Sequence, residues 1–229
     1  MPPTLVLIRH AQAHHNVDLK NHSMPDPDLT ETGIQQCLAL REHLKTALPE
    51  GRKIELIVVS PMRRTIQTCL NALDWLIEAG VPVIPDAKWQ ENQAKPCDTG
   101  TPVNLLAAEF PTIDFSQLDP VYPDKTSPAG AFYAYRRDAI LARGQAALAD
   151  LYARSEDVIA VVSHSGFMRT AVAGRWFQNA DYRIFDFEDQ TGKDEKEPYR
   201  LVEWDLTKKN GGMGMSWEEP VALGSGLPE

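Results

Sequence analysis

The chain has 229 residues, of which 43% are hydrophobic and 24% are charged, and its 23 basic and 32 acidic residues leave a net charge of −9. This length and composition suit one globular α/β domain and exclude a disulfide-stapled mini-protein, a coiled coil and a disordered chain. The negative charge argues against a protein whose main task is to bind nucleic acid or an anionic membrane, so an anionic ligand requires a local basic pocket.

The cysteines and the N-terminus indicate a reducing compartment. Cys37, Cys69 and Cys97 are widely spaced and form no CxxC pair, which favours neither a disulfide framework nor a cysteine zinc site. The first apolar run is short, lacks a preceding basic segment and ends at Arg9, so we expect neither a signal peptide nor a membrane span. We therefore expect a cytoplasmic protein.

Short apolar runs alternate with longer segments of helical periodicity along the chain. The short runs are β-branched or Leu-rich and predict buried strands, whereas the longer segments predict helices. In chain order we expect strand 4–8, helix 31–48, strand 56–59, helix 64–79, strand 81–84, helix 132–153, strand 158–162, helix 166–176 and a hairpin of 183–187 with 199–206 whose tip is 191–197.

This alternation predicts a three-layer α/β/α fold with a doubly wound, mainly parallel sheet, because parallel strands need crossover helices that cover both faces. No internal repeat or linker composition divides the chain. We expect a single domain over 1–207 with a lid-like insertion at about 92–131. Residues 208–229 are rich in Gly, Met, Ser and Pro, and we expect this tail to be loosely held.

Basic residues follow three of the predicted strands at the point where each strand ends. These are Arg9 and His10, then Arg64 in the segment 60–64, then His164. Ligands of open α/β sheets lie outside the carboxyl ends of the strands, so we expect one pocket for a compact anion there. A phosphoryl group suits guanidinium side chains, which bind its oxygens in pairs. The chain has no Gly-rich nucleotide loop, so side chains must hold the phosphate.

The same segments resemble the histidine phosphatase superfamily, in its phosphoglycerate mutase-like branch. The motif carriers are LIRHAQAHHN at 7–16, LTETGIQ at 29–35, SPMRRTIQT at 60–68, Glu91 after the third strand, and VSHSG at 162–166. The resemblance implies that His10 is the nucleophile and that Arg9, Arg64 and His164 hold the phosphoryl oxygens. It places Asn16 and Ser165 in the substrate-binding set and makes Glu91 the general acid and base. It implies neither a metal nor a cofactor.

Several assignments leave alternatives open. Arg63 and Arg64 point about 100° apart on a helix, and the spacing from Ser60 favours Arg64 as the phosphate ligand. Asp98 is the alternative to Glu91 as the acid. A metal site at the histidines near His10 is disfavoured because no carboxylate lies at ligand spacing and the arginines repel cations.

Two single positions, Ala11 and Ser165, need comment. Ala11 replaces the glycine of the family's RHG signature, which matters only where that position needs φ > 0 or a close backbone approach. Ser165 does not fit a serine-hydrolase nucleophile elbow, because that turn needs Gly two residues earlier and Ser163 stands there.

The Pro-rich stretch 111–128 is long for a loop inside a compact domain, and such loops often carry function. We hypothesise that it covers the phosphate pocket together with residues 91–100 and selects the organic part of the substrate through Phe115 and Tyr122. The alternative is packing over helix ends.

The sequence therefore predicts a metal-independent phosphomonoester hydrolase that acts through a phosphohistidine on a small phosphorylated metabolite, without nucleic-acid or membrane partners. Two alternatives remain: a phosphoglycerate mutase-type phosphotransferase, which keeps the phosphohistidine from water, and a phosphate-binding regulatory module without turnover.

Overall fold

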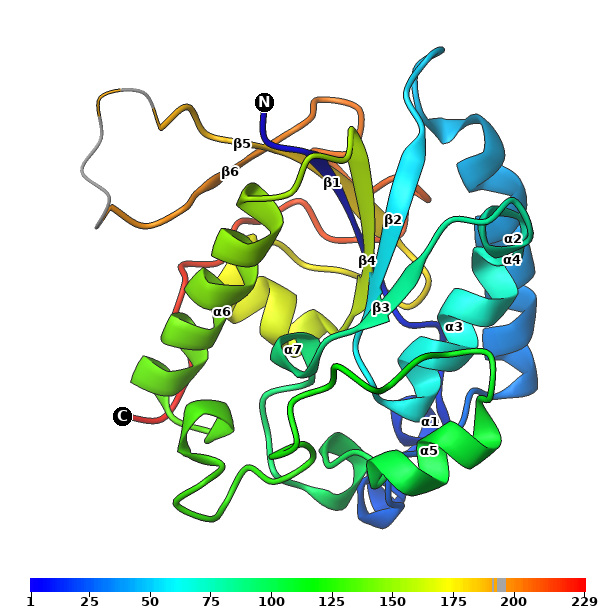
Figure 1. Ribbon diagram of the computed structural model, residues 1–229. Coiled ribbons are helices and arrows are strands. Elements are labelled where there is room, and N and C mark those ends of the chain that lie inside the picture. The colour runs from blue at the N-terminus through cyan, green and yellow to red at the C-terminus, as the bar shows by residue number, and fades with distance from the viewer. Residues whose placement is uncertain (191, 193–196) are drawn as a thin grey trace.

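A computed structural model describes residues 1–190, 192 and 197–229. Its centre is a six-stranded sheet in the order β3-β2-β4-β1-β5-β6, with helices on both faces (Figure 1). The strands are β1 Thr4–Arg9, β2 Ile54–Val59, β3 Val83–Pro85, β4 Val158–Ser163, β5 Tyr182–Phe187 and β6 Leu201–Glu203.

Strands β1 to β4 run parallel to one another, β5 pairs antiparallel with β1, and β6 pairs antiparallel with β5. The central strands β1 and β4 are buried along almost their whole length, which explains why they are continuous apolar runs rather than alternating ones. The predicted three-layer, mainly parallel α/β fold is confirmed. The two arms of the predicted hairpin pair as β5 and β6, whereas most of its predicted tip lies outside the described residues.

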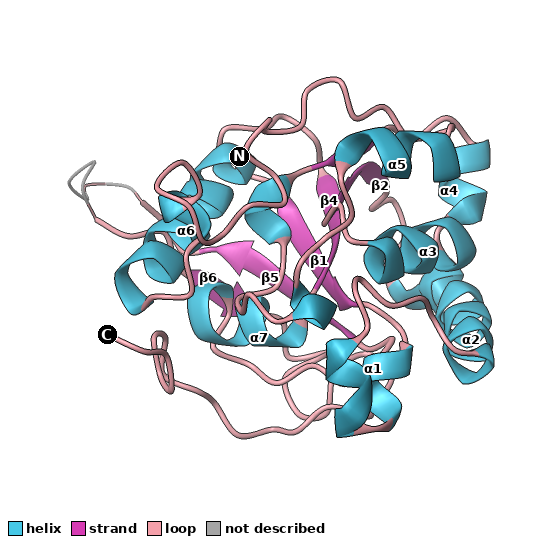
Figure 2. Ribbon diagram, turned by 90° about the horizontal axis from the view of Figure 1, so that it is seen from below, coloured by secondary structure: helices cyan, strands magenta, loops and turns pink. Residues whose placement is uncertain are grey.

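Each face of the sheet has its own core. Val6 and Ile8 point toward α2 (Glu31–Ala47) and α3 (Arg63–Ala72), and α4 (Asp74–Glu78) follows on that side. Leu5 and Leu7 point toward α6 (Arg137–Tyr152) and α7 (Ser165–Phe167). The short helices α1 (His14–Val17) and α5 (Val103–Glu109) lie across the carboxyl end of the parallel strands, as Figure 2 shows.

Helix α2 is placed by its first turn. The Thr30 hydroxyl accepts a hydrogen bond from the Gly33 N–H at 3.0 Å, which satisfies one of the free donors at the helix start. Gly33 packs directly on the chain after His10, since a Cβ at Gly33 would lie 2.1 Å from the Gln12 carbonyl oxygen. This close approach sets the path of the chain just beyond the end of β1.

The predicted helix 64–79 is wrong as one element, because it divides into α3 and α4 at Leu73. The backbone of Leu73 leaves helical geometry with φ −119° and ψ 16°. The Asp74 carboxylate then accepts from the Trp75 N–H and pairs with Arg41 at 2.9 Å. Side-chain bonding to the local backbone thus competes with continuation of the helix.

Two other helix predictions need correction. The predicted helix 132–153 begins only at Arg137, because Arg136 is extended with φ −143° and ψ 144°, and residues 131–133 form a separate 3₁₀ turn. The predicted helix 166–176 shortens to α7 followed by a π-helical segment, Met168–Val172. The Ala173 N–H donates to the Met168 carbonyl at 2.8 Å, five residues back.

The segment 92–131 contains α5 and a 3₁₀ turn at Pro96–Asp98, and the rest of it is loop. Phe115 is 6% exposed and Tyr122 is 3% exposed, and both belong to the core on the α2 side. The Tyr122 hydroxyl donates to the Pro61 carbonyl at 2.8 Å. These contacts fit packing rather than substrate contact for the two aromatic side chains.

The last 22 residues, 208–229, follow an extended path that hydrogen bonds tie to the domain. The Asp181 carboxylate accepts from the Ser216 hydroxyl, the Arg183 guanidinium donates to the Trp217 carbonyl, and the Gly224 N–H donates to Thr170. The expectation of a loosely held tail does not fit these contacts, since it was based on composition and composition does not count the buried acceptors that the domain presents.

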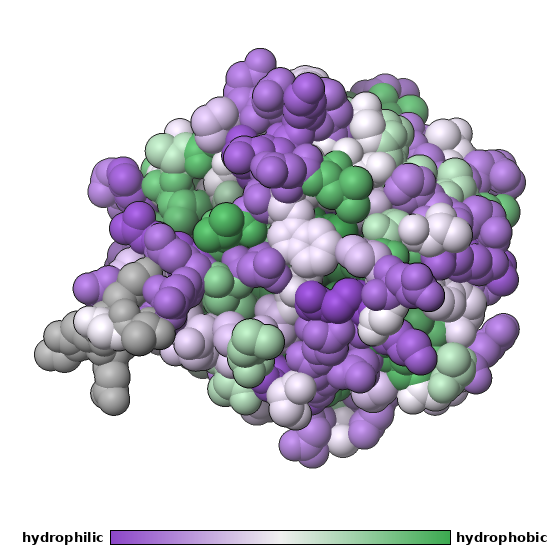
Figure 3. All heavy atoms as spheres, turned by 90° about the horizontal axis from the view of Figure 1, so that it is seen from above, coloured by the Kyte–Doolittle hydropathy of each residue, from purple (hydrophilic) through white to green (hydrophobic). Residues whose placement is uncertain are grey.

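The end of the molecule opposite α1 and α5 is mainly hydrophilic, with apolar side chains in small separate groups (Figure 3). In the part of the chain that the structure describes, every helix is too short or too polar to cross a membrane.

The approach of α2 to the chain after His10 gives a stability prediction. Gly33→Ala places a methyl group 2.1 Å from the Gln12 carbonyl oxygen, so it should lower the free energy of unfolding by about 1–3 kcal/mol despite the better helix propensity of alanine. Urea titration measures the change. Leu38→Ala, at a 39% exposed position of the same helix, is the control, and an equally stable Gly33→Ala variant would contradict the prediction.

Candidate active site

The carboxyl ends of β1, β2 and β4 bring two histidines and an arginine together. The ring centroids of His10 and His164 are 5.2 Å apart, and Arg64 Nε lies 3.2 Å from His10 Nε2. All three side chains are buried, with exposed fractions of 0–2%. The structure therefore brings His10, Arg64 and His164 together at the ends of these strands.

The hydrogen bonds of His10 define its tautomer. Nδ1 lies 2.7 Å from the Ala11 carbonyl oxygen, which only accepts, so Nδ1 carries the proton. Arg64 Nε donates to Nε2, and a guanidinium is a donor only, so Nε2 carries a lone pair. His10 thus presents an unprotonated Nε2 on the side where the cationic groups lie. Ala11 does not have a positive φ, so alanine fits the position where the family has glycine.

The His164 ring, which lies close to that of His10, has one ring nitrogen with a hydrogen-bond partner and one without in the part of the chain that the structure describes. Its Nε2 lies 2.8 Å from the Ser60 hydroxyl, at the end of β2. Its Nδ1 is buried and has no hydrogen-bond partner among the described residues. When the Ser60 hydroxyl donates to Nε2, Nδ1 carries the proton and is an unused donor.

Burial and neighbouring cations keep both rings neutral. Burial lowers the pKa of His10 well below its ordinary value, and the charges of Arg64 and Arg9 lower it further. Burial lowers the pKa of His164 in the same direction, again with Arg64 as the leading charge. His15, whose ring centroid is 5.6 Å from that of His10, has its pKa lowered to about 3, mainly by burial.

The two arginines predicted to bind phosphate differ in how many of their guanidinium donors already have hydrogen-bond partners. Arg64 donates to His10, to the Cys97 carbonyl at 2.7 Å and to Asp98 at 3.2 Å. Arg9 donates from Nη1 to the Phe177 carbonyl at 2.9 Å, and its buried Nε has no partner in the described part of the chain. Burial lowers the pKa of Arg9 to about 10, and the group remains charged at neutral pH.

Arg63 points away from His10. Its guanidinium pairs with Glu109 of α5 at 2.8 Å and donates to the Asp26 carbonyl at 2.9 Å. The neighbouring Arg64 takes the inward direction, in agreement with the spacing argument from Ser60.

Asn16 is joined to the backbone of His10 through a residue that carried no motif. Asn179 donates from one Nδ2 to the His10 carbonyl at 3.0 Å and to Asn16 Oδ1 at 3.2 Å. Ser165, predicted as a substrate ligand, is partly buried at the start of α7, and its hydroxyl has no hydrogen bond among the described residues. The structure therefore links Asn16 to His10 through Asn179, whereas among the described residues no hydrogen bond joins the Ser165 side chain to the other predicted site residues.

Glu91 and Asp98 approach the histidines from the loop after β3. Glu91 accepts from the Asn92 N–H at 2.9 Å and from the Gly166 N–H at 3.2 Å. A Cβ at Gly166 would lie 2.4 Å from Glu91 Oε1, so glycine after His164 leaves room for this carboxylate. Burial and the charge of Glu91 raise the pKa of Asp98, against the opposing effect of Arg64.

A cavity of about 220 Å³ opens beside these two carboxylates. Glu91, Asp98 and Gly166 line it, whereas His10, Arg64, His164, Phe115 and Tyr122 are not among its lining residues. Three further lining residues, Asn92, Gln93 and Lys95, belong to the segment 91–100 that the sequence analysis expected over the pocket. The lining residues that the sequence did not indicate are His22, Tyr135, Arg169, Thr170 and residues 225–227 of the tail.

Arg169 is the notable cation of this cavity. Its guanidinium lies 3.8 Å from the centre of the Trp176 ring, and its Nε is buried without a partner among the described residues. The negative charge of Glu91 acts on it. The five-residue offset from His164 on the π-helical turn, which no periodicity argument indicated, brings Arg169 to the cavity.

Two buried cations support the loop that carries the carboxylates, and no motif or periodicity in the sequence indicated either of them. Lys125 donates to the Glu91, Gln93 and Asp98 carbonyl oxygens. Arg143 of α6 donates to Asn92 Oδ1 at 2.8 Å.

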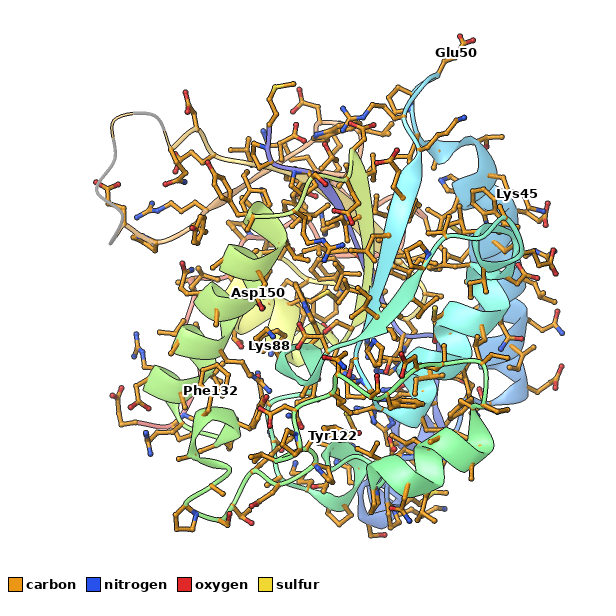
Figure 4. All side chains as sticks on the ribbon, in the orientation of Figure 1. Lys45, Glu50, Lys88, Tyr122, Phe132 and Asp150 are labelled. Carbon is orange, nitrogen blue, oxygen red and sulfur yellow. The ribbon has the colours of Figure 1, made fainter. Side chains whose placement is uncertain are left out.

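Cavity size alone does not identify the site. Larger cavities, of about 540 and 700 Å³, are lined by none of the predicted site residues. The first lies beside β3, where Lys88 pairs with Asp150 at 3.0 Å and Phe132 lines the wall (Figure 4). Among the described residues, no group of three or more His, Cys, Asp and Glu side chains is arranged to hold a metal ion.

Known proteins resemble this chain in sequence and in fold. The family model for the histidine phosphatase superfamily (branch 1) matches residues 5–192. A phosphoglycerate mutase-like protein of Arabidopsis thaliana is 34% identical over 200 residues, covering 72% of each chain, and a probable phosphatase of Schizosaccharomyces pombe is 34% identical over 168 residues, covering 70% of this chain and 73% of its own. The ecdysone phosphate phosphatase from Bombix mori superposes with a TM-score of 0.57 at 16% identity, covering 87% of this chain and 92% of its own.

The fold and the paired histidines at the ends of β1 and β4 define a phosphoglycerate mutase-like α/β protein. The chain belongs to the histidine phosphatase superfamily, branch 1.

The buried neutral histidines predict acid-induced loss of stability. A histidine whose pKa is lower in the folded state than in the unfolded chain stabilises the fold fully above the unfolded value, and this contribution is lost as the pH falls below it. For His15, with a folded pKa of about 3, the loss between pH 7.5 and pH 5 should be about 2 kcal/mol, given an unfolded pKa of about 6.5.

Urea titration at pH 7.5 and at pH 5 tests this expectation. His15→Gln should lose less unfolding free energy over this interval than the unsubstituted protein. His14→Gln, at an exposed neighbouring position, is the matched control and should behave like the unsubstituted protein. Equal pH dependence in the His15 and His14 variants would refute the assignment.

Proposed function

We propose that this protein is a metal-independent phosphomonoester hydrolase that forms a phosphohistidine at His10 on a small phosphorylated substrate. The observation that carries the proposal is the arrangement around His10, a neutral ring with its lone pair on Nε2 in a cluster of basic side chains. Two buried nitrogen atoms of these side chains, Arg9 Nε and His164 Nδ1, have no hydrogen-bond partner among the described residues. A tetrahedral dianion supplies acceptors for both, and burial makes such charge-assisted bonds strong.

In the first step, His10 Nε2 attacks phosphorus and the bond from phosphorus to the ester oxygen breaks. Arg64 must leave Nε2 for this attack, and its guanidinium then binds the phosphoryl oxygens beside it. Arg9, Arg64 and His164 stabilise the negative charge that the oxygens carry through the transition state. Glu91 gives its proton to the departing ester oxygen, so the product alcohol leaves neutral.

In the second step, water attacks the phosphohistidine and the bond from phosphorus to Nε2 breaks. Glu91 takes a proton from this water, which returns the protein to its starting state with inorganic phosphate bound. Splitting the hydrolysis in this way replaces one difficult displacement by two easier ones. We prefer Glu91 to Asp98 because Asp98 is ion-paired with Arg64 at 3.2 Å, whereas both Glu91 oxygens accept only backbone N–H groups.

The cavity beside Glu91 supports a small organic part for the substrate. Its volume of about 220 Å³ has space for a few carbon atoms. Arg169 and Lys95 line it, so a substrate with an additional polar or anionic group fits better than an apolar one. The probable phosphatase of S. pombe supports hydrolysis as the reaction, by similarity.

A phosphoglycerate mutase-type transfer is the second candidate, and the similarity to the Arabidopsis phosphoglycerate mutase-like protein favours it. A mutase returns the phosphoryl group to a hydroxyl before water reaches it, which requires a site that excludes water. Dependence of phosphoryl transfer on a bisphosphorylated primer distinguishes the mutase from the hydrolase. Tight phosphate binding without turnover would instead indicate a regulatory module.

Substitution of the nucleophile tests the proposed function. His10→Ala should lower the release of phosphate from a panel of small phosphate esters by at least about a thousandfold, because it removes the covalent route. Phosphate is measured in the presence of a chelator, where the unsubstituted protein should keep its activity.

The control for this experiment is His43→Ala, a histidine whose ring contacts the Tyr182 hydroxyl at 3.0 Å, away from the cavity. It should retain activity. Phosphate release that survives in His10→Ala, or that disappears with the chelator, would overturn the proposed mechanism.

The choice of acid is tested by the leaving group. Glu91→Gln should lower kcat about a hundredfold for an alkyl phosphate, whose alkoxide needs a proton, and much less for p-nitrophenyl phosphate, whose phenolate leaves without one. Asp98→Asn should lower both rates by similar factors. If Asp98→Asn shows the leaving-group dependence and Glu91→Gln does not, Asp98 is the acid.

A further inference from the structure

Lys125 lies beneath the loop that carries both candidate acids. The side chain comes from the segment 92–131, is 4% exposed, and has an Nζ that donates to three backbone carbonyl oxygens. The acceptors are Glu91 at 2.7 Å, Gln93 at 3.0 Å and Asp98 at 2.5 Å. Figure 4 shows Tyr122, three residues earlier, on the part of this segment that runs past the carboxyl ends of the strands.

The geometry uses every donor of the ammonium group. A charged lysine has three N–H donors and no acceptor, and the three go to carbonyls of one stretch of loop. Two of the acceptors belong to the residues that carry the candidate acids, Glu91 and Asp98. A single nitrogen atom therefore fixes the distance between the two ends of the stretch 91–98.

We propose that Lys125 is a positioning residue whose charged ammonium group holds the Glu91 carboxyl in place for proton transfer at the phosphoryl group on His10. The inference rests on the proposed hydrolase function and adds to it a residue outside the family motifs. Lys125 does not line the cavity, so it acts through the loop rather than on substrate.

The other contacts of the loop each hold one part of it. Arg143 donates to the Asn92 side chain, and Arg64 donates to the Cys97 carbonyl and the Asp98 carboxylate. The Glu91 side chain accepts from the N–H groups of Asn92 and Gly166. Lys125 differs from these groups because one nitrogen atom joins both ends of the stretch 91–98. Without the ammonium group, the carbonyls of Glu91, Gln93 and Asp98 lose their common partner. A shift of about 1 Å in a reacting group costs up to about a hundredfold in rate.

The charged groups around Lys125 make this function sensitive to pH. Arg143 faces it from α6, Arg64 from α3, His164 from the end of β4, and Asp98 and Glu91 from the loop itself. Burial and the Arg143 charge outweigh the two carboxylates and lower the pKa of Lys125 to about 7. As the pH rises through this value, the amine keeps only two N–H donors and loses its charge, so the loop is held less firmly.

The experiment compares Lys125→Met and Lys125→Arg with the unsubstituted protein. Phosphate release from a small alkyl phosphate is followed between pH 5.5 and pH 9 with chelator present. The unsubstituted protein should lose kcat as the pH rises above about 7. Lys125→Met should lower kcat at pH 6 about tenfold or more with KM changed less than about threefold, and its profile should lack this alkaline decline.

Lys125→Arg separates charge from packing. A guanidinium stays charged up to pH 9 and offers several donors, so this variant should retain more kcat than Lys125→Met and should show no alkaline decline near pH 7. Because the Arg variant keeps the cation, its pH profile also decides the question if the Met variant does not fold, as judged by thermal unfolding.

Lys88→Met is the matched control, a lysine that pairs with Asp86 and Asp150 at the β3 edge (Figure 4). It should keep the kcat and pH profile of the unsubstituted protein. A folded Lys125→Met variant with unchanged kcat, or an alkaline decline that persists in both Lys125 variants, would overturn the role of Lys125 alone. An unsubstituted protein without His10-dependent phosphate release would overturn the proposed function and this inference together.

Discussion

Positive charge is buried at the carboxyl ends of the parallel strands, and the local structure is organised around it. Arg64, Lys125 and Arg143 are all at most 4% exposed, in a protein with a net charge of −9. Burying a cation costs free energy unless hydrogen bonds or an opposite charge replace its water. Carbonyl oxygens from loops replace that water for Arg64 and Lys125, which explains why irregular backbone closes over this end of the sheet. The remaining free donors define the place where an anion is stabilised.

The same charge sets the chemistry of His10. A histidine near a carboxylate would be protonated and lose its nucleophilic lone pair, whereas one among guanidiniums stays neutral. The Ala11 carbonyl accepts a hydrogen bond from His10 Nδ1, so the lone pair is on Nε2, which faces Arg64. In the proposed mechanism, one set of side chains therefore both attracts the phosphate and keeps His10 neutral, and no separate base is needed to activate His10.

The residues of the candidate site that lie just after the strands could be predicted from the sequence, because each is adjacent in sequence to a recognisable buried strand. His10, Arg64 and His164 come just after buried strands, and the carboxyl ends of adjacent parallel strands meet at one edge by construction. The sequence did not predict the positions of Asn179, Arg143 and Lys125, because these depend on how segments without motifs pack. Lys125, for example, is a lone lysine in a Pro-rich loop, and lysine is almost always a surface residue.

The cavity beside Glu91 and the breaks in the predicted helices were not predicted from the sequence, for related reasons. Arg169 reaches the cavity from a π-helical turn, a geometry that helical periodicity does not indicate. At the break at Leu73, the Asp74 carboxylate accepts from the Trp75 N–H and pairs with Arg41 of α2, and helical periodicity indicates neither contact. Phe115 and Tyr122 were expected at the substrate, but large aromatic side chains in a loop bury more apolar surface against the core than in a polar cavity.

In the proposed mechanism, the contact between Arg64 and His10 couples substrate binding to activation of the nucleophile. The nitrogen that would attack phosphorus already accepts a hydrogen bond from the guanidinium that would bind the phosphate, so the two functions cannot be exercised until Arg64 moves. A dianionic phosphoryl group provides a better acceptor for Arg64 than a neutral imidazole does. Arrival of the correct anion therefore both draws Arg64 off Nε2 and frees the lone pair, whereas a neutral molecule leaves His10 covered. Asp98 and the Cys97 carbonyl, which hold the far side of the guanidinium, limit that movement to a small rotation. In this mechanism, selectivity for phosphate esters arises at His10 itself, before the cavity beside Glu91 distinguishes one organic group from another.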